Sequence, residues 1–411
     1  MQGPTVSDVE RLYPSPTTVA AKTVALDARA AAHGTIRAFD DRVIEFLDSL
    51  SKRLFLLARP RPELAPLAFF LRRSATARLA SGTLGSLSSG ARAVPQGVML
   101  HIPPTNVDTL FLYTLAIALL AGNSNIVRIS QNAGPATHEI LEILFDELDR
   151  DPEIARLVTV VRFGRDEESL RELTSVADVR MIWGGDASIE TIRRAPLQAH
   201  AKDLTFPDRL SIAAISVDSW NEADESTRDS LIAALYNDSY WFDQMACSSP
   251  QQLLFVGDQE RASVAMREVL EMLADVARQR YELPGGQAIN KMVAVVEGVA
   301  RGSGTVSWVS NSSVGLAALT LDDAIDIRPG GGFFSTQQLD ALVDFAPQVT
   351  RRVQTLGVFG FDRPDLDLLV DRLNGRGIDR IVPIGTALDF SQIWDGKNLV
   401  LESLRLVSLN V

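Results

Sequence analysis

The sequence predicts an α/β protein with two lobes, each built on a largely parallel sheet. Strand-like and helix-like segments alternate from residue 98 to residue 183, and a second series begins near residue 211. Such alternation is typical of parallel strands joined by crossover helices. The chain has 411 residues, 46% of them apolar, whereas a single core rarely grows beyond roughly 250 to 300 residues. Two cores are therefore expected.

The N-terminal part of the chain precedes this alternation. Residues 1–75 favour helices with Ala, Leu and Phe on one face, interrupted by prolines at positions 14, 16, 60, 62 and 66. Residues 76–94 are rich in Ser, Gly and Ala, which predicts a loop or an exposed hairpin. We expect residues 1–75 to wrap the first lobe without taking part in chemistry.

The first lobe begins at residue 98. Its predicted elements are strand 98–102, helix 107–121, strand 125–129, helix 135–149, strand 157–163, helix 166–175 and strand 179–183. The most apolar run, Leu110 to Ala121, has about a dozen residues, whereas a membrane-spanning helix needs about 20. We therefore expect a buried helix and no membrane span.

The second lobe begins near Ser211. Its predicted elements are strand 211–216, helix 226–236, strand 252–256, helix 258–279, strands near 305–309 and 354–360, helix 364–374 and strand 379–383. The tail, residues 399–409, is strand-like and so apolar that a free edge would be a liability. We expect it to pair with a neighbouring element or subunit.

Composition excludes several classes of function. The net charge is -12 and no block of Lys or Arg forms a stripe, so nucleic acid is not expected as a partner. A single cysteine forms no internal disulfide, and residues 1–18 have no basic start followed by an apolar stretch, which favours a reducing cytoplasm. The four histidines are scattered and there is no second cysteine, so no metal site is predicted.

The lone cysteine, Cys247, is the candidate nucleophile. A thiolate attacks acyl carbonyls, and the oxyanion that forms needs donors such as a side-chain amide and the N–H of the nucleophile. Asn106 is the candidate amide. Two other interpretations stay open: Asn106 caps the helix that follows it, and Cys247 is a small buried hydrophobe.

Glycines mark further candidate sites. Gly164 follows one predicted strand and Gly184-Gly185 follow another, each before a helix whose N–H groups can face a phosphate. Pro284-Gly285-Gly286 and Pro329-Gly330-Gly331-Gly332 are most simply turns. The second of these precedes Phe333-Phe334, which are candidates to line an acyl channel.

Four motifs, taken in order, carry a resemblance to a known family. They are Ile102-Pro103-Pro104-Thr105-Asn106, the strand from Ala121-Gly122-Asn123 to Arg128, Trp183-Gly184-Gly185-Asp186, and Phe242-Asp243-Gln244-Met245-Ala246-Cys247. They resemble the oxyanion-hole segment, the ribose-binding strand, the phosphate turn and the Phe-Asn-Gln-x-x-Cys nucleophile segment of the aldehyde dehydrogenase superfamily. Within it, the chain is most similar to the LuxC-type acyl-CoA and acyl-protein reductases, over roughly residues 95–411.

The resemblance implies a fold, a domain plan and a set of site residues. The fold is aldehyde dehydrogenase-like, with two Rossmann-like α/β lobes and a small oligomerisation hairpin or strand. The implied domains are N-terminal helices with an NAD(P)-binding domain (1–210, with 76–94 as the oligomerisation hairpin), a catalytic domain (211–386), and a C-terminal return with an oligomerisation strand (387–411). The implied roles are Cys247 and Asn106 in catalysis, Pro104, Thr105, Arg128, Ser130, Gly164, Gly184, Gly185 and Asp186 in cofactor binding, and Trp241, Phe242, Phe333 and Phe334 at the substrate.

Two departures from the family pattern refine the expected activity. Arg128 replaces a Lys, and its planar fork suits a 2′-phosphate, which favours NADPH over the alternative NADH. The family's water-activating Glu is absent from the run 204–210, so the acyl-enzyme should react slowly with water. The resemblance therefore implies NADPH-dependent reduction of an acyl-CoA or acyl-carrier-protein thioester to the aldehyde, by a homo-oligomer, with an acyl-transferring or synthetase partner also conceivable. Two alternatives are an NAD(P)-dependent aldehyde dehydrogenase that forms acid, and a redox-silent acyltransferase subunit.

Overall fold

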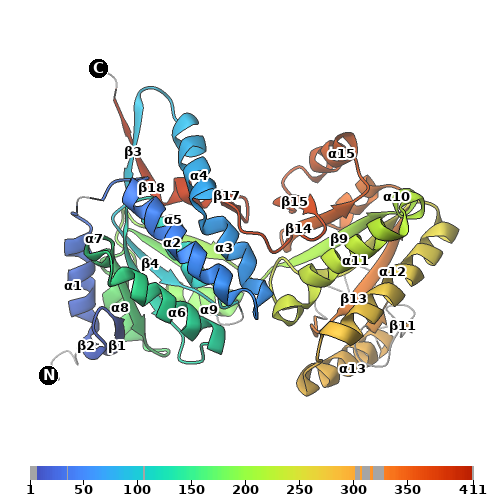
Figure 1. Ribbon diagram of the computed structural model, residues 1–411, viewed down its shortest axis with the longest axis horizontal. Helices are drawn as coiled ribbons and strands as arrows, with labels where there is room; N and C mark the ends of the chain where they lie inside the picture. The colour runs from blue at the N-terminus through green and yellow to red at the C-terminus, as the bar shows by residue number, and fades with distance from the viewer. Residues whose placement is uncertain are drawn as a thin grey trace. The chain divides into compact units, whose positions relative to one another are not determined.

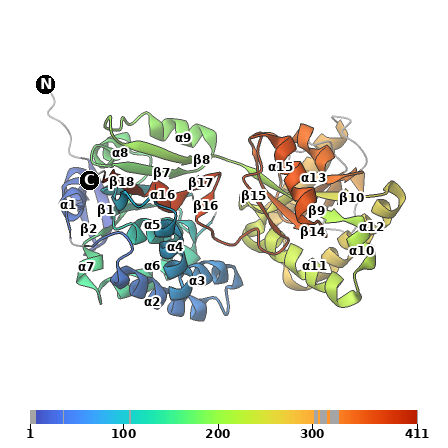
Figure 2. The same ribbon diagram turned by 90° about the horizontal axis from the view of Figure 1, so that it is seen from above.

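The protein folds into two compact units, seen here in a computed structural model (Figure 1). Residues 7–34, 36–104, 107–300, 306–307, 315–317 and 328–409 are described. The first unit comprises Met1–Asp208 together with Asp389–Val411, and the second comprises Arg209–Leu388. The chain therefore enters the second unit once and returns to the first, where its last strand, β18 Leu404–Ser408, lies (Figure 2).

The sheet of the first unit has the strand order β2-β1-β6-β5-β4-β7-β8. Its strands are β1 Asp8–Tyr13, β2 Thr17–Ala20, β4 Val98–Ile102, β5 Ser124–Ile129, β6 Val158–Arg162, β7 Val179–Trp183 and β8 Lys202–Phe206. The five adjacent strands β6, β5, β4, β7 and β8 are parallel, whereas β1 runs antiparallel to both β6 and β2. The carboxyl ends of the parallel strands thus share one edge, which is where α/β sheets bind ligands.

Helices cover both faces of this sheet. They are α1 Ala21–Ala31, α2 Asp41–Leu57, α3 Ala65–Leu71, α4 Arg73–Gly85, α5 Leu110–Leu120, α6 Pro135–Leu148, α7 Pro152–Ala155, α8 Glu167–Thr174 and α9 Asp186–Arg193, with the 3₁₀ helix η1 Pro62–Leu64. Apolar residues of α1, α8 and α9 share a core with β4 and β7. Every residue of α5 is buried, which accounts for its uniformly apolar sequence. Among the described residues, no helix combines the length and hydropathy of a membrane span.

Three N- and C-terminal segments differ from expectation. Residues 8–20 form the β1–β2 hairpin instead of helix, because alternating Val9 and Val19 pair across it. The expected loop or hairpin at 76–94 is mostly the helix α4, since an isolated exposed Gly82 does not interrupt a run of helix formers. The tail begins as the short helix α16 Leu399–Glu402 and not as a strand, but it then forms β18 Leu404–Ser408, whose pairing with β3 Ala91–Pro95 confirms the expected pairing with a neighbouring element. A small hairpin-like pair, β16 Ile393–Trp394 and β17 Lys397–Asn398, precedes it.

The sheet of the second unit has the order β11-β12-β13-β10-β9-β14-β15. Its strands are β9 Leu210–Ser216, β10 Pro250–Val256, β11 Val306–Ser307, β12 Gly315–Ala317, β13 Phe333–Leu339, β14 Val353–Phe359 and β15 Arg380–Pro383. All described pairs are parallel except β11–β12. The helices are α10 Val217–Glu222, α11 Glu225–Tyr240, α12 Gln259–Arg280, α13 Gly285–Ala300 and α15 Arg363–Leu373, with the 3₁₀ helices η2 Trp241–Gln244 and η3 Leu342–Gln348.

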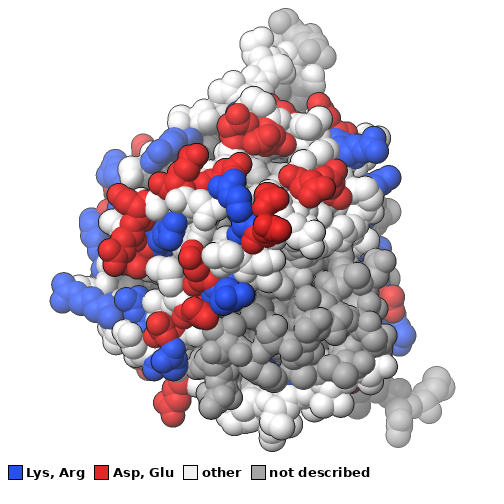
Figure 3. All heavy atoms as spheres, turned by 90° about the vertical axis from the view of Figure 1, so that its right-hand side faces the viewer, with Lys and Arg blue, Asp and Glu red and all other residues white. Residues whose placement is uncertain are grey.

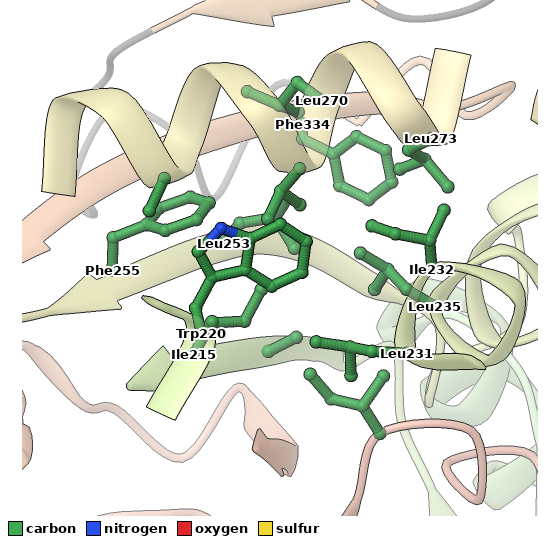
Figure 4. Packing of buried hydrophobic residues seen from close by; sticks show 14 of the residues in the cluster. Ile215, Trp220, Leu231, Ile232, Leu235, Leu253, Phe255, Leu270, Leu273 and Phe334 are labelled. Carbon is green, nitrogen blue, oxygen red and sulfur yellow. The ribbon is translucent and has the colours of Figure 1, made fainter. Parts of the chain in front are cut away.

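Two cores hold this second sheet. One lies under α11 and α12, where Trp220, Leu253, Phe255 and Phe334 interdigitate (Figure 4). The other lies under η3 and α15. Gly285 and Gly286, expected in a turn, begin α13 instead, because Pro284 stands just before the first turn and accepts from the N–H of Gln287. On the described part of the face that Figure 3 shows, acidic and basic side chains are interspersed.

The fold class predicted from the sequence is confirmed: both units are α/β with mainly parallel sheets.

Candidate active site

Cys247 lies in a short loop, residues 241–249, which we call the Cys247 loop. It joins α11 to β10 and begins with η2, so it stands at the amino edge of the second sheet, beside the segment that precedes β13. Cys247 takes part in no disulfide and is half-buried. Its carbonyl oxygen accepts a hydrogen bond of 2.8 Å from Ser211 Oγ at the start of β9. The two described core clusters of this unit do not include Cys247, and both interpretations of it, nucleophile and small hydrophobe, stay predictions.

The turn that leads into Cys247 has an unusual backbone. Phe242, Asp243 and Gln244 have φ values of 55°, 54° and 63°, in the left-handed region. Each such residue other than glycine costs on the order of 1 kcal/mol, so a left-handed run persists only where its surroundings hold it. Trp241 and Phe242 are half-buried in this turn.

The Gln244 side chain supplies much of that restraint. It is 1% exposed. Its Nε2 donates to the carbonyls of Pro250 at 2.8 Å and Phe333 at 2.9 Å. Its Oε1 accepts from the N–H groups of Gly332 at 2.9 Å and Phe333 at 3.1 Å. One amide thus ties the turn to the starts of both β10 and β13.

The partner of this turn is the triple-glycine segment, Gly330 to Gly332, whose φ values are 75°, 61° and 76°. The N–H of Gly331 donates to the carbonyl of Asp243 at 3.0 Å. A Cβ at Gly330 would stand 2.7 Å from that same carbonyl oxygen. Close approach and positive φ together require glycine here, so the expected simple turn is a packed partner of the Cys247 loop.

A tyrosine that follows α12 braces the same turn. The hydroxyl of Tyr281 donates to Asp243 Oδ1 at 2.8 Å and lies 2.8 Å from Gln287 Oε1. Burial, with the Asp243 carboxylate, raises the pKa of Tyr281, so its hydroxyl stays protonated and able to donate.

The expected aromatic acyl channel needs correction. Phe334 is 0% exposed and belongs to the core of Figure 4, so it does not face a substrate. Phe333, on the opposite side of the strand, is 2% exposed. Their burial follows from β13, a strand that the sequence did not predict. Trp241 and Phe242 stay predictions as substrate contacts.

In the first unit, Arg128 lies near the end of β5, at the carboxyl edge of the sheet. Its Nε and Nη2 donate to the carbonyl of Phe163 at 3.3 and 3.2 Å, and Nη2 also reaches the carbonyl of Gly164 at 3.1 Å. The guanidinium lies over the Phe163 ring, 5.0 Å from its centroid. Burial and the nearby charge of Arg165 lower the pKa of Arg128. The charge of Arg165 therefore acts on Arg128 near the ends of β5 and β6.

The other predicted cofactor residues follow neighbouring strands of the same sheet. Gly184 and Gly185 follow β7, and Gly185 caps α9 without a side-chain bond. A Cβ at Gly185 would meet no described atom within 4 Å, so the approach to the first turn of α9 is open. Pro104 follows β4, and Ser130 Oγ accepts from the N–H of Asn132 at 3.2 Å in the turn after β5.

Two predicted residues, Thr105 and Asn106, lie outside the described residues. The next helix along the chain, α5, begins at Leu110 with Thr109 in the cap position.

Several residues of the second unit escaped the sequence reasoning. Tyr281, Gln287 and Lys291 surround the triple-glycine segment, and Lys291 Nζ donates to the carbonyl of Gly331 at 2.9 Å. The available signals were three consecutive glycines, which favour positive φ, and one lysine directly before the apolar run 292–296.

Comparison with known proteins places the chain in a family. The family model described as "Acyl-CoA reductase (LuxC)" matches residues 87–302. Long-chain acyl-protein thioester reductase 2 of Photobacterium leiognathi is 29% identical over 172 residues, which cover 41% of this chain and 34% of the relative. The corresponding reductase of Aliivibrio fischeri is 28% identical over 172 residues, 41% of this chain and 33% of the relative. The match thus spans about a third of the length of these curated relatives.

Solved structures agree on the fold. A putative aldehyde dehydrogenase from Burkholderia cenocepacia superposes with a TM-score of 0.68 at 14% identity, over 98% of this chain and 95% of that one. An NAD-dependent aldehyde dehydrogenase from Sinorhizobium meliloti gives 0.66 at 13% identity, over 98% of this chain and 92% of that one. Since the family model covers more than half of the sequence, the chain belongs to the LuxC family of acyl-CoA reductases, on an aldehyde dehydrogenase fold.

Proposed function

We propose that this protein reduces an acyl thioester to the aldehyde with NADPH, through a covalent acyl group on Cys247. The observation that carries the proposal is the placement of the chain's single cysteine, half-buried at a sheet edge, in a loop restrained through Gln244. Membership of the LuxC family supports it.

The first step is acyl transfer to the enzyme. The Cys247 thiolate attacks the thioester carbonyl, the bond from the acyl carbon to the donor sulfur breaks, and the donor thiol leaves with a proton. The N–H of Cys247 and the side chain of Asn106 are the proposed donors to the oxyanion. The fixed carbonyl of Cys247, bonded to Ser211, supports this by orienting the backbone at the nucleophile.

The second step is reduction. The chemistry that a bound nicotinamide cofactor would supply is a hydride for the acyl carbon held on Cys247. The carbon of the resulting tetrahedral oxyanion would still be bonded to Cys247 Sγ. Its oxygen would accept hydrogen bonds from the donors proposed for the first step, the N–H of Cys247 and the side chain of Asn106. Collapse then breaks the bond from carbon to sulfur, releases the aldehyde and restores the thiolate, so that one acyl thioester, one reduced cofactor and one proton give aldehyde, thiol and oxidised cofactor.

The carboxyl edge of the first sheet has the donors that a dinucleotide needs. The open N–H groups of Gly185 and the first turn of α9 suit the pyrophosphate. The Asp186 side chain carries a negative charge that opposes a phosphate, so the proposal assigns this role to the glycine backbone. Pro104, Thr105, Ser130 and Gly164 complete the proposed cofactor contacts.

The preference for NADPH rests on the paired cations Arg128 and Arg165. A 2′-phosphate beside them would offset their mutual repulsion, and the carbonyl of Phe163 already anchors the Arg128 guanidinium. NADH lacks that phosphate and would leave the repulsion between the two charges in place.

The proposal also explains why hydride, and not water, should complete the reaction. In the run 204–210 the one carboxylate is Asp208, which is exposed. Without a buried general base, water attacks the acyl-enzyme slowly. The proposed acyl donor is CoA or a carrier protein, and the proposed assembly is a homo-oligomer.

One experiment tests the mechanism. Purified protein is incubated with a panel of acyl-CoAs without cofactor, and intact mass is recorded before NADPH is added. We expect one acyl adduct, on Cys247, which disappears as aldehyde forms. A Cys247→Ala variant that reduces as fast as wild type would overturn the assignment. Rapid acid formation from aldehyde without CoA would instead indicate a hydrolytic dehydrogenase, and failure to bind either cofactor a redox-silent acyltransferase.

A further inference from the structure

The Cys247 loop is joined to a buried lysine through a single peptide unit. The carbonyl of Gly331 accepts from Lys291 Nζ at 2.9 Å. The N–H of the same peptide unit, which belongs to Gly332, donates to Gln244 Oε1 at 2.9 Å. Lys291 on α13 and Gln244 in the left-handed turn therefore act on opposite ends of one amide.

A cation on the carbonyl end strengthens the bond at the N–H end. A charged donor polarises the peptide, and hydrogen bonds in series reinforce one another in a low-dielectric interior. Lys291 and Gln244 are 2% and 1% exposed. Burying an ammonium is unfavourable, and it lowers the pKa of Lys291 to about 8. An apolar residue would pack in this place at lower cost, so the lysine calls for another explanation.

The other end of Gln244 closes the loop that carries the nucleophile. Its Nε2 reaches the carbonyl of Pro250 at 2.8 Å, so the side chain bridges the two ends of the segment that contains Cys247. Gln251 Nε2 adds a bond of 2.8 Å to the carbonyl of Gln244. The position of Cys247 is thus set by these bonds, against the tendency of three left-handed residues to relax.

We propose that Gln244 and Lys291 are positioning residues, which act together through the Gly331–Gly332 peptide to hold Cys247 in the geometry for acyl transfer. This inference rests on the proposed role of Cys247 as nucleophile. Neither side chain needs to touch the substrate. A displacement of about 1 Å at a reacting atom can cost about 100-fold in rate, so loosening the loop should slow acylation strongly.

The first variant is Gln244→Glu, which keeps the shape and removes the Nε2 donor. The ionised carboxylate would face the carbonyls of Pro250 and Phe333. We expect acylation of Cys247 by acyl-CoA, measured by mass in single turnover without cofactor, to slow at least tenfold, with less than a twofold change in apparent KM. The loss should shrink toward pH 6, because a protonated carboxyl can again donate to one of these carbonyls.

The second variant is Lys291→Met, which removes the charge from the carbonyl end. We expect acylation to slow about fivefold while the melting temperature stays the same or rises. A merely structural role predicts that activity and stability fall together. In a double variant the two effects should be less than multiplicative, since both act on one peptide.

Gln338→Ala is the matched control. Gln338 lies on β13 and donates to the carbonyl of Gly257 at 2.7 Å. This bond is at the carboxyl ends of β10 and β13, whereas Gln244 contacts their amino ends. It should leave acylation unchanged. Alkylation of Cys247 by iodoacetamide separates this inference from the proposed function, because it reports loop geometry without any acyl substrate.

Two results would overturn the inference. One is that both variants are acylated and alkylated at wild-type rates. The other is that the acylation rate of Gln244→Glu falls by the same factor at every pH and that the variant is unfolded to a matching extent. If Gln244→Glu does not fold, Lys291→Met alone decides, since wild-type acylation there excludes the coupling. Altered alkylation in the variants, without any acyl adduct in wild type, would instead refute the proposed function and leave the positioning intact.

Discussion

Arg180 in β7 forms a bidentate ion pair with Asp203 in β8. Nε and Nη2 donate to the two carboxylate oxygens at 2.7 and 3.0 Å, and Nη1 donates to the carbonyls of Ile192 and Ala195 at 3.0 and 2.9 Å. Arg180 is 1% exposed. One side chain therefore joins two strands to the end of α9, the helix beside the proposed cofactor site.

Breaking this pair should destabilise the first unit. Asp203→Asn leaves the buried guanidinium without its counter-charge, and such losses cost about 3 to 5 kcal/mol. We expect a decrease of that order in the free energy of unfolding, measured in urea. Asp367→Asn removes half of an exposed pair with Arg363 and should change it by less than about 1 kcal/mol. Equal effects would contradict the role given to burial.

Lys291 should make stability depend on alkaline pH. Burial lowers its pKa from 10.5 to about 8, so between these values the unfolded chain binds the proton and the folded chain does not. Stability therefore rises with pH in that window, and below pH 8 the buried charge costs about 3 kcal/mol.

The measurement is the difference in unfolding free energy between wild type and Lys291→Met at pH 7, 8, 9 and 10. The unfolding free energy of wild type should increase relative to that of the variant as pH rises. Buried tyrosines such as Tyr240, whose pKa burial raises, contribute to both proteins and cancel in the difference. A difference that stays constant from pH 7 to pH 10 would mean that Lys291 is not perturbed.

Gly330→Ala should impair the Cys247 loop. Its φ of 75° is unfavourable for alanine, and the new Cβ would stand 2.7 Å from the backbone carbonyl of Asp243. We expect acylation to fall at least tenfold and the unfolding free energy by about 1 to 3 kcal/mol. Gly285→Ala, where a Cβ meets open space, serves for comparison and should be neutral or slightly stabilising. An equal decrease in the acylation rate of both variants would contradict a specific role of Gly330 in the Cys247 loop.

The β3–β18 ribbon should mediate assembly. It is a two-stranded sheet, a form that is marginal alone in water, and it exposes Leu406 at 53% and Leu409 at 44%. Deleting residues 404–411 keeps the buried Leu399 and Val400 and should reduce the mass in solution to that of a monomer. Light scattering gives the answer, and unchanged assembly would refute the prediction.

The sequence predicted the strands that are buried on both faces, because such strands read as continuous apolar runs. β4, β7 and β10 are of this kind, and they were found almost to the residue. β1 was missed because it lies near the sheet edge and alternates polar with apolar residues. β13 was missed because its second half, Thr336-Gln337-Gln338, is polar.

Only those parts of the candidate site that depend on local sequence could be predicted. Cys247 and Arg128 stood out by residue type and by their place after recognisable elements, and their roles stay predictions. The contact of Gln244 with Gly332 joins residues 88 positions apart. No local pattern encodes it, because it depends on β10 and β13 being neighbours in the sheet.

The return of residues 389–411 to the first unit has a consequence for synthesis on the ribosome. Asn123 donates to the carbonyl of Ser403, Tyr113 to the carbonyl of Ser391, and β3 has β18 as its partner. These contacts form only after residues 389–409 are translated, and these residues follow the whole of the second unit. The nascent first unit must therefore remain unfinished while its neighbour is made, and a chaperone that shields α5 during this delay would raise the yield.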